Sequence, residues 1–108
     1  MSIRVTGRLL AAGRVLAGMS VRELAEASGV HKATISELEQ RDAFDVAPVP
    51  ERRVGMVAGR VWTAIVAALA THGVEFVPGD EVHGEGVRRI VDVARFRADP
   101  NKTIETPE

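Results

Sequence analysis

SVRELAEASGVHKATISELE, residues 20–39, is the stretch that decides the fold of this chain. Ser20 is followed three residues later by Glu23, the pattern of a capping box, so a helix should begin there. Gly29 should end that helix with a positive φ, because glycine adopts the left-handed conformation at no steric cost. A further helix should follow from His31. The stretch therefore predicts two short helices joined by a tight turn.

Small and aliphatic residues stand where these two helices would pack together. Ala25 is small enough for the helix from His31 to cross close above it, and Val30 would fill the corner between the two helices. Ile35 and Leu38 would project from the helix that starts at His31 into the same core. This spacing is typical of a helix-turn-helix, which places its second helix in the major groove of DNA. The alternative is a generic helical hairpin in a bundle, although such hairpins rarely need so short a turn.

Length and composition allow one domain with a modest core. The chain has 108 residues, and only 4% of them are aromatic, so the core should be mostly aliphatic. The net charge is −1, but basic residues outnumber acidic ones up to residue 60, whereas the segment 75–85 is acidic. A local positive face is what DNA requires. The absence of cysteine excludes disulfides and thiolate metal sites and is compatible with a reducing cytosol.

The apolar stretch 54–70 raises the question of a membrane span. It is shorter than the roughly 20 residues that a span usually needs, and it carries Arg60 near its middle. The N-terminus also lacks a basic region followed by an apolar run, so no secretory signal is expected. We therefore expect a cytoplasmic protein with no membrane segment.

The remaining elements follow from helical periodicity and turn residues. A first helix is expected over 3–17 and a long fourth helix over 51–72, with a proline-containing loop at 42–50. Strands at 74–77 and 87–93 should form a β-hairpin. The expected fold is mainly α, with a helix-turn-helix head at 1–41, the loop at 42–50, a dimerisation region of long helix and β-hairpin at 51–97, and a flexible tail at 98–108.

Several residues within about 5–41 form a recognisable set: Arg14, Gly18-Met19-Ser20, Glu23-Leu24-Ala25, Gly29-Val30, Thr34-Ile35-Ser36 and Glu39. This set resembles the lambda-repressor-like, or XRE, helix-turn-helix family. The resemblance implies a compact helical DNA-binding domain that works as a homodimer on a pseudo-palindromic operator. It also implies an ion pair between Arg14 and Glu39, which would tie the first helix to the end of the third. Where the family usually has Ser or Thr as the cap of the third helix, this chain has His31.

The start of the third helix would enter the groove, so its outward residues are the candidates for base contacts. These are His31, Lys32, Ala33, Ser36 and Glu37. Lys32 could donate to guanine, Ala33 could contact a thymine methyl group, and Glu37 could accept from cytosine. Lys32 and Glu37 could instead belong to a solvated face. The candidates for contacts with the DNA backbone are Ser20, Val21, Arg22, Thr34 and Arg41, of which Ser20 could be a cap alone.

The fourth helix is apolar on more than half of its surface and therefore needs a partner. A second subunit could cover it, which suits a two-fold symmetric dimer, and the strand at 87–93 could pair with its own copy. The alternative is packing within the chain, under the hairpin. The residues expected at the dimer contact are Val54, Val57, Ala58, Val61, Trp62, Ile65, Leu69, Val87 and Ile90.

No catalytic residue, metal site or cofactor is expected. His31, His72 and His83 match no established ligand spacing, and no nucleophile–base pair or phosphate-binding glycine loop is visible. The sequence therefore predicts a homodimeric, sequence-specific DNA-binding transcription regulator that represses by occupying a promoter. The alternative is an antitoxin-like protein-interaction module that binds a partner through the long helix and the hairpin.

Overall fold

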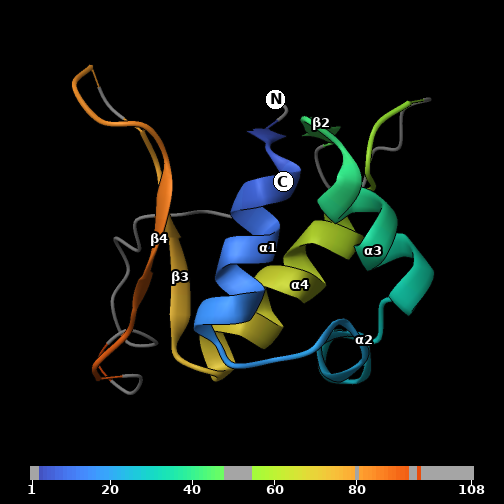
Figure 1. The fold of residues 1–108 in the computed structure, drawn as a ribbon, viewed down its shortest axis with the longest axis horizontal. Coiled ribbons are helices and arrows are strands. Elements are labelled where there is room, and N and C mark those ends of the chain that lie inside the picture. The colour runs from blue at the N-terminus through green and yellow to red at the C-terminus, as the bar shows by residue number, and fades with distance from the viewer. Residues whose placement is uncertain (1–2, 48–54, 80, 93–94, 96–108) are drawn as a thin grey trace.

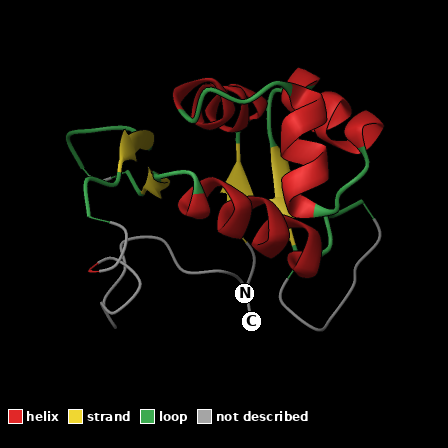
Figure 2. Ribbon diagram, turned by 90° about the horizontal axis from the view of Figure 1, so that it is seen from below, coloured by secondary structure: helices red, strands yellow, loops and turns green. Residues whose placement is uncertain are grey.

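The computed structural model describes residues 3–47, 55–79, 81–92 and 95. In chain order its elements are β1 (Ile3–Val5), α1 (Gly7–Leu16), α2 (Val21–Ser28), α3 (Lys32–Gln40), β2 (Phe44–Val46), α4 (Gly59–Thr71), β3 (Val74–Val77) and β4 (Gly86–Arg89). Helices α1 and α4 form a central layer (Figure 1). The β3–β4 hairpin packs on one side of this layer, and α2 and α3 pack on the other (Figure 2).

Each of the first three helices begins with a side-chain cap. The Thr6 hydroxyl accepts from the Leu9 N–H of α1 at 3.1 Å. At α2, the Ser20 hydroxyl and the carboxylate of the third helical residue form the expected capping box, and Gly29 ends the helix with φ 75°. The Nδ1 atom of His31 accepts from the Ala33 N–H at 3.1 Å and so caps α3. The helix-turn-helix geometry is thus set locally by its own caps.

A two-stranded antiparallel sheet differs from the sequence prediction at two places. Ile3 to Val5 was expected in the first helix, but these residues form β1 and pair with β2, which lies in the stretch expected to be a loop. Phe44 and Val46 are buried and flank the half-buried Asp45, which is the alternation of a strand. The first helix therefore begins only at Gly7, because the preceding residues take their hydrogen bonds from β2 rather than from a helical turn.

The fourth helix is shorter than predicted. It begins at Gly59, since Gly55 has φ 79° and the chain there is joined to β2. The Val57 N–H donates to the Asp45 carbonyl oxygen, and the Ala47 N–H donates to the Val57 carbonyl oxygen, both at 2.8 Å. Residues 48–54 lie outside the described residues. No helix in the described part of the chain has the length and apolar character needed to cross a bilayer.

The predicted hairpin is present, with a shorter return strand. Positive φ at Gly73 turns the chain from α4 into β3, and β3 pairs with β4 so that Glu75 lies opposite Arg88 and Phe76 opposite Val87. The return strand ends at Arg89 rather than at residue 93, which is not described. The tail expected at 98–108 likewise lies outside the described residues.

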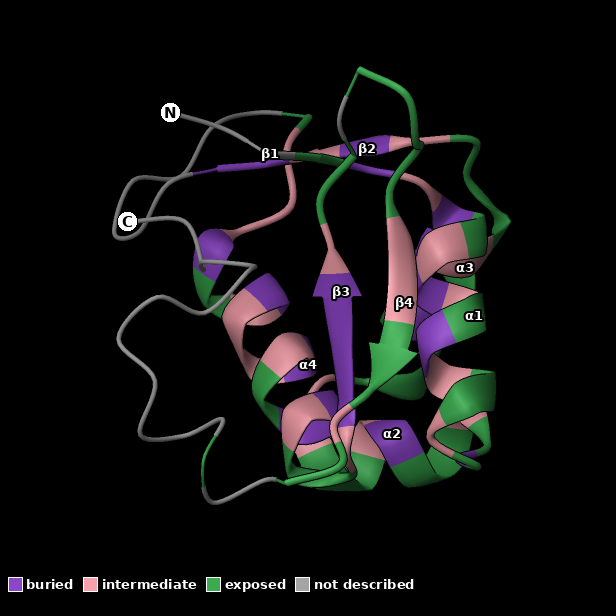
Figure 3. Cartoon of the chain, turned by 90° about the vertical axis from the view of Figure 1, so that its left-hand side faces the viewer, coloured by how far each residue is buried: buried purple, intermediate pink, exposed green. Residues whose placement is uncertain are grey.

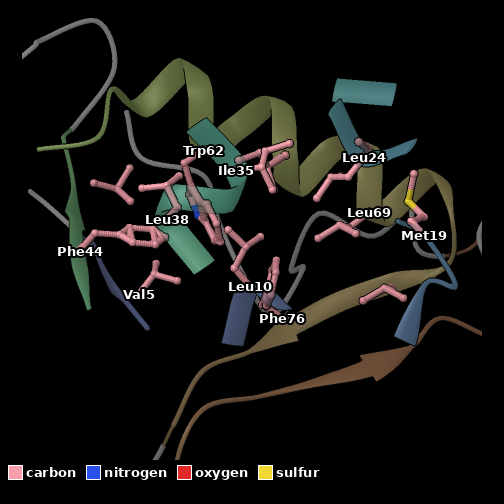
Figure 4. Close-up of a cluster of buried hydrophobic side chains, with 14 residues drawn as sticks. Val5, Leu10, Met19, Leu24, Ile35, Leu38, Phe44, Trp62, Leu69 and Phe76 are labelled. Atoms are coloured by element: carbon pink, nitrogen blue, oxygen red, sulfur yellow. The ribbon is translucent and has the colours of Figure 1, made fainter. Parts of the chain in front are cut away.

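One hydrophobic core joins the head, α4 and the hairpin (Figure 4). Trp62 lies between Phe44 and Phe76, with ring centroids 5.9 Å and 5.2 Å apart. Trp62, Ile65 and Leu69 are at most 2% exposed, so the prediction that they contact a second subunit is wrong. The head and the hairpin together cover this face of α4, as the burial pattern shows (Figure 3). Packing within the chain, the alternative, accounts for these three residues.

Candidate nucleic-acid interface

Helix α3 presents a continuous exposed face on the side of the molecule away from the hairpin (Figure 1). Ile35 and Leu38 anchor the helix, being 0% and 3% exposed. The opposite side of α3 carries all five candidates for base contacts and one candidate for a backbone contact. These exposed residues are His31, Lys32, Ala33, Thr34, Ser36 and Glu37.

His31 has one ring nitrogen committed to the protein. Its Nδ1 accepts a hydrogen bond from the N–H of Ala33, so the neutral ring carries its proton on Nε2. The imidazole is exposed at the very start of α3. His31 therefore offers a donor to a ligand and suits an acceptor such as guanine N7 or a phosphate oxygen.

The start of α2 supplies a second exposed helix terminus. The Glu23 carboxylate accepts from the Ser20 N–H at 2.9 Å, and the Ser20 hydroxyl accepts from the Glu23 N–H at 3.1 Å. The Ser20 backbone N–H, followed by the Ser20 hydroxyl, lowers the pKa of Glu23. Arg22 is exposed and lies 3.9 Å from Glu26, whereas Val21 is half-buried and packs against the core. Only the backbone of Val21 is suited to contact a phosphate.

Arg14 and Glu39 form the expected link between α1 and α3. Arg14 Nε and Nη2 donate to the two carboxylate oxygens at 2.7 Å and 3.0 Å, and Nη1 donates to the Met19 carbonyl oxygen at 2.9 Å. The hydrogen bond to Glu39 raises the pKa of Arg14 against the opposing effect of desolvation. This bidentate pair fixes the orientation of α3 relative to α1.

The end of α3 is clamped against the start of α1. The Gly7 N–H donates to the Arg41 carbonyl oxygen at 3.2 Å. A Cβ atom at Gly7 would lie 2.3 Å from that oxygen and 2.6 Å from the carbonyl oxygens of Leu38 and Glu39. Only glycine permits this approach. The Arg41 guanidinium donates to the Glu37 carboxylate, so two residues expected to contact DNA contact each other.

The charges near α3 border an open hollow between α2 and α3. It is lined by Arg22, Ala25, Glu26, Gly29, Val30, His31 and Lys32. Among the described residues, Lys32 has no ion-pair partner. The hollow is therefore bordered by one unpaired cation and by one arginine whose charge is offset by its neighbour.

Comparison with known proteins agrees with this geometry. Residues 10–43 match a family model described as helix-turn-helix. The chain carries a lambda-repressor-like helix-turn-helix domain. The match supports a DNA-binding regulatory role for this domain. No curated protein and no solved structure matches the chain.

Two further exposed residues, one at the end of α3 and one in α1, were not among the predicted contacts. Gln40 lies four residues after Ser36 and eight after Lys32, so helical periodicity alone could have placed it on the exposed face of α3. Arg8 lines a hollow with Gln40 and Arg41 because α1 packs against α3. Its position in the chain carried no sign of this, since the contact is between distant segments.

The other candidates for a dimer contact are only partly accessible. Val57, Ala58 and Val61 are half-buried, as are Val87 and Ile90 on the hairpin side. Val54 lies outside the described residues. In the part of the chain that the structure describes, no group of three His, Asp or Glu side chains is placed to hold a metal ion.

Proposed function

We propose that this chain is a sequence-specific transcription regulator that represses by occupying promoter DNA in the bacterial cytoplasm. The observation that carries the proposal is the exposed face of α3, which is anchored by buried Ile35 and Leu38 and accompanied by the exposed, capped N-terminus of α2. This arrangement leaves the first turns of α3 free to enter a major groove.

The proposed base contacts come from the first turns of α3. Lys32 would donate to guanine O6 or N7, Ala33 would contact a thymine methyl group, and Ser36 would bond a base edge. His31 would donate through Nε2, because its Nδ1 already accepts the hydrogen bond that caps α3. Glu37 lies on the same surface, and reading cytosine would require its ion pair with Arg41 to open.

Phosphate contacts would orient the domain on the duplex. The exposed residues Ser20, Arg22 and Thr34, with the backbone of Val21, lie at the starts of α2 and α3, where helix dipoles favour anions. Arg41 would hold the other end of α3, and neighbouring Arg8 would add to it. Such contacts position the protein without reading sequence.

We propose that two copies bind a pseudo-palindromic operator. A single α3 reads few base pairs, and two-fold pairing doubles the site with half-sites about one duplex turn apart. Val57, Ala58 and Val61 on one side, or Val87 and Ile90 on the other, remain the candidate contacts because each is half-exposed.

Selection of bound duplexes from a random pool at moderate salt tests the proposal. A two-fold symmetric consensus is expected. Lys32→Glu and Arg41→Glu should weaken binding, and losing one phosphate cation should flatten the log–log salt dependence by about 0.9. Arg95→Glu, at an exposed position outside the proposed DNA and dimer contacts, is the matched control and should bind as the wild type does. If both α3 variants also bind as the wild type does, the DNA assignment is wrong and the protein-binding alternative is favoured.

A further inference from the structure

Two of the three cations on the surfaces of α2 and α3 that would face DNA are paired with carboxylates of the same helix. Arg22 lies 3.9 Å from Glu26, and the guanidinium of Arg41 donates to Glu37. In both pairs the partners are four residues apart. Lys32 alone has no such partner in the described part of the chain. The surface is thus far less positive than its count of basic residues suggests.

Helix stability does not account for the Arg22–Glu26 pair, whereas the Glu37–Arg41 pair has the favourable order, with its cation at the C-terminal end of α3. The side chains of Arg22 and Glu26 are 81% and 75% exposed, and exposed pairs of this spacing contribute little to folding. The order in α2 is also the unfavourable one, because Arg22 stands in the first turn, where the helix dipole disfavours a cation. An acidic residue before a basic one would serve the helix better. We therefore look for a role of the Arg22–Glu26 pair in DNA binding rather than in helix stability.

We propose that Glu26 and Glu37 determine specificity by restraining Arg22 and Arg41 from binding phosphate on DNA of arbitrary sequence. The inference rests on the proposed function. When either arginine binds a phosphate, the partner carboxylate is brought within a Debye length of the DNA charge and is repelled by it, whether or not the pair opens. Base contacts from α3 offset this cost on the operator only. Specificity is a difference between two affinities, and a repulsive element on the wrong sequence raises it.

Glutamine substitution tests the restraint because it keeps the shape and removes the charge. Glu26→Gln, Glu37→Gln and the double variant would be compared with Glu81→Gln, which makes the same change on the exposed hairpin tip. Binding to a random-sequence duplex and to the selected consensus would be followed by fluorescence anisotropy over a range of salt. Thermal unfolding of each variant would confirm that it folds.

Each substitution near α3 should raise affinity for the random duplex several-fold at low salt. The log–log salt slope should steepen by up to about 0.9 for each arginine released. Affinity for the consensus duplex should rise less, so the ratio of consensus affinity to random-duplex affinity should fall. The effect of Glu37→Gln should vanish when Arg41 is also replaced by glutamine, because the carboxylate acts through that arginine.

The outcomes separate this inference from the proposed function. If the wild type selects a symmetric consensus but the glutamine variants bind random DNA as the wild type does, the restraint is refuted and the regulator stands. The restraint is likewise refuted if Glu81→Gln has an equal effect, since net charge alone would then explain it. If Glu37→Gln relaxes the preference at one base pair and leaves random binding unchanged, Glu37 reads a base instead. If the wild type selects no sequence, both proposals fail.

Discussion

Replacing Arg14 with methionine should lower the free energy of unfolding by about 3 kcal/mol. The side chains of Arg14 and Glu39 are 19% and 8% exposed, so the substitution leaves a carboxylate largely shielded from water and without its two donors. Removing one partner of a buried pair costs about 3–5 kcal/mol, and the residual exposure of Arg14 places this pair at the lower end. For a chain of this size the whole stability is roughly 5–15 kcal/mol.

Urea unfolding followed by far-ultraviolet circular dichroism measures the loss directly. The midpoint of thermal unfolding should fall by about 10–20 °C, from the usual relation between free energy and melting temperature in small domains. Glu39→Gln keeps one acceptor for Arg14 and should cost less than Arg14→Met.

The double variant Arg14→Met/Glu39→Leu decides whether the pair is the cause. It removes both charges together and should recover most of the loss, to within about 1–1.5 kcal/mol of the wild type. The remainder reflects the Met19 carbonyl oxygen, which loses its donor. The reasoning is refuted if Arg14→Met costs under about 1 kcal/mol, or if the double variant loses as much as the two single variants together.

Three further predictions follow from individual contacts. Gly7→Ala should lower the free energy of unfolding, measured in urea, by about 2–4 kcal/mol, because the added Cβ would overlap carbonyl oxygens at the end of α3. Gly84→Ala, whose Cβ would meet open space, is the control and should change little. Equal effects would contradict the close contact at Gly7. Because the pKa of Glu23 is lowered in the folded protein, its cap stabilises the fold at pH values above the ordinary glutamate pKa, and this stabilisation is lost as pH falls through the folded-state pKa. Glu23→Gln should therefore flatten the acid part of the profile of melting temperature against pH. An unchanged profile would count against the cap. Trp62, the only tryptophan, should emit at short wavelength at every protein concentration, and a red shift on dilution would show that a second subunit covers it after all.

Local signals account for what the sequence predicts well. The capping box at Ser20 and the glycine at position 29 act within a few residues, and both have the predicted geometry. The link between Arg14 and Glu39 was expected only through the family resemblance, because it joins residues 25 positions apart. Periodicity then places the exposed face of α3 correctly, although Gln40 was overlooked.

The errors lie where distant segments meet. Residues 3–5 form a strand only because residues 44–46 lie beside them, and nothing near either segment announces the pairing. The start of α4 is displaced because Val57 bonds to β2. Trp62, Ile65 and Leu69 looked available to a second subunit because the extent to which the hairpin and the head would cover them could not be judged from the pattern of α4.

The indole of Trp62 touches an aromatic ring from each half of the chain, Phe44 beside the end of α3 and Phe76 in the hairpin. Neither half can melt without opening the packing of the other, so the domain should unfold as a single cooperative unit. Any molecule that binds and stabilises the native hairpin would thereby increase the fraction of molecules in which α3 is folded. Duplex bound at α3 would in turn protect the amide hydrogens of the hairpin from exchange.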